Sequence, residues 1–319
     1  MNASDKMRPQ LSYRGRFAPS PSGYLHFGSL ITALASFLDA KKNHGTWLVR
    51  LEDIDPPREK KGASDHILKT LEAFGLHWDE NILFQSKQSD YYQHIIEQLF
   101  NEHHCYYCQC TRGQIKAIGG IYQGHCRDLN IEKDNSAIRV INQHAVNQYH
   151  DLIQGNVQCD QALAKEDFII YRKDGLFAYQ LAVVADDLYQ NINHVIRGCD
   201  LLEPTARQLS FYPLFAEKSL GDFSQQMPSS NRTTQQIHPP FFGHIPLAVT
   251  EQGYKLSKQN KAPAIDNNNP QPALFAALQF LGQHPPHELQ FSNVNEIIQW
   301  AIIHWQLESV PKKREIQLT

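Results

Sequence analysis

The chain has 319 residues, of which 41% are hydrophobic and 20% are charged, and its formal net charge at pH 7 is −3. This composition predicts a globular protein with a substantial core, in one large or two ordinary domains, and excludes a general electrostatic attraction to nucleic acid. No apolar run approaches the roughly 20 residues of a membrane span, and the polar start from Met1 to Tyr13 lacks the apolar core of a signal peptide. We therefore expect a cytoplasmic protein with no membrane partner.

The first part of the chain predicts a strand, a helix and a second strand. Residues 13–17 and 46–51 have strand character, and residues 30–42 carry apolar side chains at helical spacing. Strands joined in this way form a βαβ unit, whose parallel sheet binds ligands at the carboxyl ends of its strands. Residues 16–20 and Glu52 lie at such ends.

Two further helices are expected from their capping residues and their apolar stripes. Ser64 or Asp65 can cap the first of these helices, and Ser89 or Asp90 can cap the second. A strand is predicted over residues 167–172, before a turn.

The second half of the chain continues the α/β pattern. Apolar runs at residues 183–187 and 192–197 end in polar side chains, as active-site segments require. Residues 222–236 are rich in Ser, Gln, Asn and Thr, which predicts a disordered surface insertion. Helical patterns recur in residues 273–281 and 295–305.

The loop sequence RFAPSPSGYLHFGS at residues 16–29 predicts a phosphate-binding site. Its prolines and glycine break regular structure, while Ser29 can cap a helix that begins at Leu30. The loop would then deliver His26 and free backbone N–H groups to a helix N-terminus, where anions bind.

A second motif, KLSK at residues 255–258, complements the first. Lys255 and Lys258 flank a short polar segment that contains Ser257, in a stretch that follows Gly253. Such a loop can close over a triphosphate and neutralise the charge that develops during reaction. Together the two motifs resemble the two halves of one ATP site.

Four of the six cysteines, Cys105, Cys108, Cys110 and Cys126, fall within one short stretch. In a cytosolic chain this clustering favours a metal site over disulfides. Zinc needs four tetrahedral ligands, and the same stretch offers further candidates in His103, His104, Tyr122 and His125.

The two phosphate motifs resemble the HIGH and KMSKS signatures of class I aminoacyl-tRNA synthetases, with Ser29 and Leu256 as departures from the wider pattern. The RFAPSPSG lead-in and LEDIDP at residues 51–56 are similar to the glutamate-specific branch, and the resemblance runs from about residue 14 to the end. The variants HFGS and KLSKQN, the cysteine cluster and the short chain resemble the glutamyl-queuosine tRNA(Asp) synthetase family, stand-alone paralogues of glutamyl-tRNA synthetase.

The resemblance implies an α/β fold: a Rossmann-type class I synthetase catalytic domain with an inserted zinc-containing module. We expect no anticodon-binding domain, because few residues follow Lys258. The expected divisions are a flexible tail (1–12), the first half of the catalytic domain (13–100), an inserted module (101–166), the second half with its polar insertion (167–258), and a helical region (259–319).

The resemblance also implies an activity. The enzyme would use ATP and Mg²⁺ to convert L-glutamate to glutamyl-adenylate, and would transfer glutamate to queuosine at the wobble position of tRNA(Asp), acting as a monomer. His26 and Lys258 are the implied catalytic residues. The implied ATP-binding residues are His26, Gly28, Lys255, Ser257 and Lys258.

Two other functions remain open from the sequence. A truncated conventional glutamyl-tRNA synthetase would charge a tRNA 3′ end, but the expected lack of an anticodon-binding domain argues against it. A non-catalytic, synthetase-like RNA-binding regulator is disfavoured because Glu52, Arg197 and Lys258 are intact.

A glutamate pocket must offer donors for two carboxylates and an acceptor for one ammonium. By resemblance, Glu52 holds the ammonium, Tyr179 contributes a hydroxyl, and Arg197 joins residues 16–20 on the substrate; which arginine takes which carboxylate is open. The implied glutamate-binding residues are Arg16, Phe17, Ala18, Pro19, Ser20, Glu52, Tyr179 and Arg197. Asp186 and Asp187 could contact ribose or amine, or could cap a helix.

The family's zinc pattern, Cys-x-Cys-x₁₁-Tyr-x₃-Cys, matches Cys108, Cys110, Tyr122 and Cys126. A phenol ligand is uncommon because its unperturbed pKa is about 10, so His125 remains an alternative. Four protein ligands leave no open position, which predicts a structural zinc site.

Overall fold

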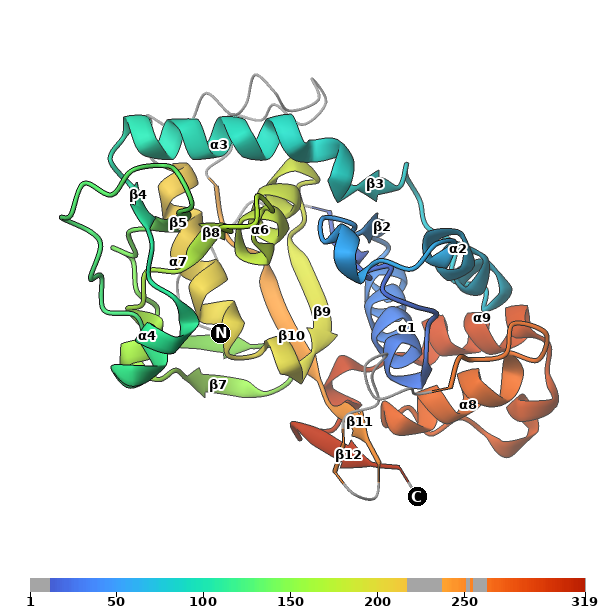
Figure 1. Ribbon diagram of the computed structural model, residues 1–319. Coiled ribbons are helices and arrows are strands. Elements are labelled where there is room, and N and C mark those ends of the chain that lie inside the picture. Colours follow the sequence, from blue (N-terminus) through green and yellow to red (C-terminus); the bar gives the residue numbers. More distant parts are fainter. Residues whose placement is uncertain (1–11, 217–236, 251–252, 255–262, 319) are drawn as a thin grey trace.

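The computed structural model describes residues 12–216, 237–250, 253–254 and 263–318 (Figure 1). The lysine motif with Lys255, Ser257 and Lys258, the expected insertion at 222–236 and all but the last residue of the expected tail lie outside the described residues. Within the described ranges, no helix has the length and apolar character needed to cross a membrane.

A parallel sheet forms the centre of the amino-terminal half. Strand β1 (Arg14–Phe17) pairs with β2 (Thr46–Leu51), which pairs with β3 (Leu83–Phe84), and helix α1 (Phe27–Lys42) connects the first two strands. The apolar face of α1 is buried, as its spacing predicts. The predicted βαβ unit is therefore confirmed.

Two later strands form a separate two-stranded sheet that lies beside β1. Strand β9 (His194–Gly198) pairs in parallel with β10 (Phe241–Ile245). The Arg14 amide donates to the Asn193 side chain at 2.8 Å, and the Asn193 amide donates to the Arg14 carbonyl at 3.0 Å, so β9 lies beside β1. Two segments separated by the whole inserted region thus lie side by side, as two neighbouring parallel sheets.

The phosphate-loop helix begins earlier than its sequence suggests. Helix α1 starts at Phe27, and its N-cap is His26, whose Nδ1 accepts the Ser29 amide at 3.3 Å. The prediction that Ser29 caps a helix starting at Leu30 was wrong. An imidazole nitrogen takes the role that a serine hydroxyl usually fills.

The predicted caps of the next two helices were also wrong. Helix α2 (Ala63–Ala73) has Gly62 as its N-cap, in the left-handed region at φ = 76°, and α3 (Ser89–Asn101) follows Gln88. The expected caps lie in the first turns instead, where Asp65 and Asp90 face the positive end of the helix dipole.

The inserted region forms its own antiparallel sheet, at the opposite side of the molecule from α1 (Figure 1). Strand β5 (Ala137–Val140) lies between β4 (Cys105–Cys108) and β8 (Ile169–Tyr171). Strand β8 follows the division expected at residue 166 but belongs to the same sheet. The remaining elements are α4 (Arg112–Ala117), the hairpin β6 (Gln148–Asp151) and β7 (Gly155–Gln158), and α5 (Gln161–Ala164).

Helices cover both parts of the structure. Helices α6 (Tyr179–Tyr189) and α7 (Pro204–Ala216) share a core with α3 and the antiparallel sheet. Helices α8 (Gln271–Phe280) and α9 (Val294–His304) pack on α1, which confirms the two late helical patterns. Short elements complete the described chain: β11 (Leu247–Val249), β12 (Glu315–Gln317), and single turns at Pro56–Arg58, Gln85–Gln88, Cys199–Leu201, His287–Phe291 and Leu307–Ser309.

Candidate active site and cysteine cluster

A buried charge network joins the first two strands to α6. Asp187 accepts hydrogen bonds from Arg16 Nε at 3.0 Å, Arg16 Nη2 at 3.2 Å and Arg50 Nη2 at 2.7 Å. All three side chains are buried. Burial alone would raise the pKa of Asp187, but the two guanidinium groups hold it below its ordinary value.

Asp186 directly precedes Asp187 in α6 and has a different set of hydrogen-bond donors. Its Oδ2 accepts hydrogen bonds from Tyr92 at 2.8 Å and Gln85 at 2.7 Å. Burial raises the pKa of Asp186 to about 6, although Arg50 opposes this shift. Asp186 and Asp187 lie inside α6 rather than at its start, so the structure excludes helix capping, one of the two alternatives considered for them.

Arg197 on β9 is held from several directions but keeps one free donor. Its Nε donates to His244 Nε2 at 3.0 Å, and its Nη2 donates to Thr205 Oγ1 at 2.6 Å and Gln208 Oε1 at 2.7 Å. Within the described part of the chain, its buried Nη1 has no hydrogen-bond partner. Because an unpaired buried donor is costly, an anionic ligand oxygen would be favoured at this position.

A cavity of about 560 Å³ opens next to this network. Ser20, Glu52 and Tyr179, three of the residues predicted to bind glutamate, line it. The volume is in the range of small-molecule sites. Cationic residues that the sequence did not single out also line it: Arg58, Lys60 and Arg172.

Electrostatic coupling shows that Glu52 and Tyr179 lie near the buried arginines. Burial raises the pKa of Glu52 to about 7, and Arg50 and then Arg16 oppose that shift. Burial also raises the pKa of Tyr179, while Arg197 lowers it and Glu52 raises it further. The fold therefore gathers Arg16, Glu52, Tyr179 and Arg197 around one place, although their roles stay predictions.

The phosphate loop lies at the start of α1. Phe17 ends β1, Ala18 follows it, and the Pro19 carbonyl accepts the Glu52 amide at 3.0 Å, which fixes the loop to the end of β2. Gly28 is the second residue of α1 and follows the N-cap His26 by two positions. His26 and Gly28 are outside the lining of the 560 Å³ cavity.

The chain returns to this loop just after the lysine motif. Ala264 forms a β-bridge with His26, and the Ile265 amide donates to the Leu25 carbonyl at 3.1 Å. Residues 264 and 265, which follow the lysine motif in sequence, therefore contact the phosphate loop near His26. The placement of Lys258 relative to that contact stays a prediction.

Several residues of the network were missed by the sequence reasoning. Arg50 is the one charge within β2, and His244 interrupts the otherwise uncharged β10. Both strands are almost wholly buried. A charged or polar side chain within such an apolar strand is the sequence feature that could have identified Arg50 and His244. Thr205 and Gln208 on α7 gave no such signal.

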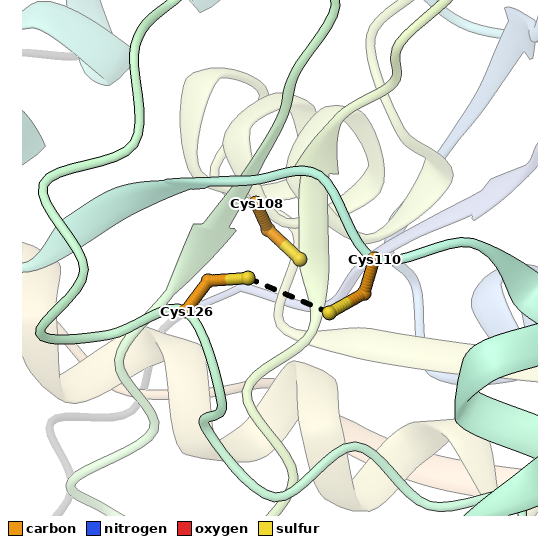
Figure 2. Close-up of side chains that lie close together, drawn as sticks. All are labelled: Cys108, Cys110 and Cys126. Carbon is orange, nitrogen blue, oxygen red and sulfur yellow. Dashed lines mark hydrogen bonds between the residues drawn. The ribbon is translucent and has the colours of Figure 1, made fainter.

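The cysteine cluster brings three thiols together, as Figure 2 shows. The sulfur atoms of Cys108, Cys110 and Cys126 all lie within 4.8 Å of one another, and Cys110 and Cys126 are 3.4 Å apart. A tetrahedral zinc with bonds of about 2.3 Å would separate its sulfur ligands by about 3.8 Å. The donor set therefore fits zinc.

Tyr122 lies at the same place, whereas His125 does not. The Tyr122 hydroxyl accepts the Cys126 amide at 2.7 Å. Arg139 lies over the Tyr122 ring at 3.8 Å and donates to Cys108 Sγ at 3.3 Å. His125 is exposed and belongs to no metal-ligand group among the described residues. The geometry favours Tyr122 as the fourth ligand.

The clustered thiols shift one another's pKa values in opposite directions. Burial would raise the pKa of Cys126, but hydrogen bonds with Tyr122, Cys110 and Cys108 hold it below its ordinary value. Burial, and then the neighbouring Cys126 and Cys108, raise the pKa of Cys110 to about 12. A divalent cation would reverse this effect because it stabilises thiolates.

We expect Glu52→Gln to make the protein more stable at pH 8. The pKa of Glu52 is raised to about 7, so its ionisation disfavours the folded state as pH rises from about 4.5 to 7. The variant should gain about 1–3 kcal/mol in free energy of unfolding at pH 8 and almost nothing near pH 4.5. Urea titrations across this range measure the difference, with exposed Glu72→Gln as the control variant. A gain in Glu52→Gln that does not change with pH would contradict the assignment.

We expect one zinc ion per chain in protein purified without added metal. Cys110→Ser should lose the metal because it removes one of three clustered thiolates. Cys159→Ser is the matched control, since Cys159 is also partly exposed but lies outside the cluster. Elemental analysis measures the zinc content of each variant, and equal content in the two variants would refute the assignment of the cysteine cluster as a metal site.

Comparisons with known proteins identify the fold and the relatives. The family described as tRNA synthetases class I (E and Q), catalytic domain, matches residues 12–220. The glutamate-tRNA synthetase structure from Elizabethkingia anophelis superposes with a TM-score of 0.73 at 23% identity, over 97% of this chain and 68% of that chain, which shows a shared fold.

Two curated relatives are much closer in sequence. The Glutamyl-Q tRNA(Asp) synthetase of Colwellia psychrerythraea is 61% identical over 312 residues, which cover 96% of this chain and 94% of that protein. The protein of the same name from Escherichia coli K12 is 50% identical over 307 residues, or 96% and 93% of the two chains. The chain therefore belongs to the class I tRNA synthetases, a family of ligases, and within it to the Glutamyl-Q tRNA(Asp) synthetases.

Proposed function

We propose that this enzyme activates L-glutamate with ATP and transfers it to queuosine in the anticodon of tRNA(Asp). The glutamate assignment rests on two opposite charges that lie near one another. Glu52 lines the cavity, and nearby Arg197 has a buried Nη1 without a hydrogen-bond partner among the described residues. The names of the relatives support the tRNA(Asp) acceptor.

In this proposal each polar group of glutamate meets a complementary side chain. Glu52 accepts from the ammonium, and Arg197 Nη1 donates to a carboxylate, with the Tyr179 hydroxyl beside both. Arg16 contributes positive charge while Asp187 fixes two of its nitrogens. The loop of Phe17, Ala18, Pro19 and Ser20 completes the site.

The reaction then needs ATP oriented for in-line displacement. A glutamate carboxylate oxygen attacks the α-phosphorus, the bond to the β,γ-diphosphate breaks, and pyrophosphate leaves. His26, Gly28 and the first amides of α1 would hold the phosphates, and Lys255, Ser257 and Lys258 would stabilise the charge that develops. Mg²⁺ would supply further positive charge to the phosphates when bound.

Transfer follows from the mixed anhydride. A hydroxyl of the queuosine cyclopentene ring attacks the glutamyl carbonyl carbon, the anhydride bond breaks, and AMP leaves. Cys108, Cys110, Tyr122 and Cys126 would hold a structural zinc ion that takes no part in these steps, because four protein ligands leave no open coordination position. The expectations of a monomer and of a cytoplasmic location stay predictions.

Lys258→Ala should slow adenylate formation by about 10²- to 10³-fold, with a small effect on the KM for glutamate. The reason is that its charge is needed where negative charge develops in the transition state. Glutamate-dependent exchange of pyrophosphate into ATP, without tRNA, measures this rate. Lys261→Ala is the neighbouring control; an unchanged exchange rate in Lys258→Ala would exclude the proposed ATP loop.

Labelled glutamate should be transferred only to tRNA(Asp) from cells that make queuosine. Because the nucleophile is a hydroxyl of the modified base, nuclease digestion should recover the label in the anticodon fragment. Unmodified tRNA(Asp) is the matched control. Label on the 3′-terminal adenosine would instead show conventional charging.

A further inference from the structure

Behind Arg197 lies a buried pair that does not touch the cavity. Asp151, at the end of β6, and His244, on β10, are both fully buried, and His244 Nδ1 lies 2.6 Å from Asp151 Oδ2. The other ring nitrogen, Nε2, lies 3.0 Å from Arg197 Nε and 3.1 Å from Thr205 Oγ1. Asp151, His244 and Arg197 itself are absent from the lining of the cavity, whereas Tyr179, whose pKa burial raises and Arg197 lowers, lines it.

The partners of His244 determine its tautomer. An arginine Nε can only donate, so His244 Nε2 must offer a lone pair to Arg197. The ring proton then lies on Nδ1 and is donated to Asp151. A proton on Nε2 would instead place two donors against each other.

The charges around the ring keep His244 neutral. Asp151 and Arg197 contact the ring, and the charge of Asp200 acts on it. Burial and the positive charge of Arg197 lower the pKa of His244, while the hydrogen bond to Asp151 and the charge of Asp200 oppose this shift. Burial would raise the pKa of Asp151, but His244 and nearby backbone amides hold it below its ordinary value. An ionised carboxylate thus supports a neutral imidazole, as in hydrolase triads.

We propose that Asp151 and His244 form a positioning pair for Arg197. The pair holds the imidazole in the tautomer that accepts from Arg197 Nε, while Thr205 and Gln208 hold Nη2. With these two nitrogens fixed, Nη1 is presented in one orientation to a carboxylate of the amino-acid substrate. This inference rests on the proposed function, in which Arg197 binds glutamate.

The sharpest test is Asp151→Asn. Asp151 Oδ1 accepts the amides of Ile153, Gln154 and His244 at 2.8–3.1 Å, and an asparagine oxygen can keep these bonds. The new amide nitrogen would face His244 Nδ1 and donate to it, which moves the ring proton to Nε2 and against Arg197. We expect the KM for glutamate to rise about 10-fold or more, as for a lost hydrogen bond to a charged group.

Two readouts separate this role from a merely structural one. The KM for ATP should stay close to that of the unsubstituted enzyme, and the ¹⁵N spectrum of histidine-labelled protein should show the exchange of tautomer. Asp160→Asn is the matched control, because the Asp160 side chain caps α5 by accepting the Leu163 amide at 2.8 Å and an asparagine oxygen can keep that bond. It should leave both KM values and the ¹⁵N spectrum unchanged.

A pair of variants at His244 keeps the test decisive if Asp151→Asn does not fold. His244→Asn can still donate to Asp151 but lacks an acceptor that reaches Arg197, whereas His244→Gln can extend a carbonyl oxygen toward Arg197. We expect a raised glutamate KM in the first and partial rescue in the second. Equal KM values in the two variants would overturn the inference.

Arg197→Ala distinguishes failure of this inference from failure of the proposed function. If Arg197→Ala raises the glutamate KM while Asp151→Asn and His244→Asn leave it unchanged, the positioning pair is refuted and the glutamate site stands. If Arg197→Ala itself leaves the glutamate KM unchanged, the carboxylate assignment fails, and the positioning role fails with it.

Discussion

The pairing of Asp187 with Arg16 and Arg50 is the interaction on which the site depends. It connects β1 and β2 to α6, which follows them in sequence only after the entire antiparallel module. Removing the carboxylate would deprive buried Arg16 of its ion pair and leave buried Arg50 with the longer ion pair to Asp186 at 3.9 Å, which costs far more than loss of a surface ion pair does. The same contact fixes the strand ends from which the phosphate loop and Glu52 emerge.

Burial of these charges also destabilises the folded protein around the proposed glutamate site. Glu52 and Asp186 are buried enough for their pKa values to rise to about 7 and about 6, even though Arg50 favours their ionised forms. Arg197 keeps a buried donor without a partner in the described protein. Such local instability is typical of sites organised to receive a charged ligand, since the ligand supplies the missing partners.

The inserted module is stabilised by different means. The small core around its cysteines contains Tyr106, Cys108, Tyr122 and Cys126 and few aliphatic side chains. Asp167 supports it from the side, because it accepts hydrogen bonds from Tyr106 at 2.6 Å and Arg127 at 2.7 Å. A core of this size gains much from a metal ion, which replaces hydrophobic burial with coordinate bonds.

Local spacing along the chain was enough to predict the βαβ unit, both late helices and the cluster of Cys108, Cys110 and Cys126. That His26 rather than Ser29 caps α1 emerged from the fold, since capping depends on which side chain reaches the free amides. The fold also decided the partners of buried charge: Arg50 meets Asp187 across 137 positions, and His244 meets Asp151 across 93. No local pattern encodes such pairs, because strand order and helix packing bring them together.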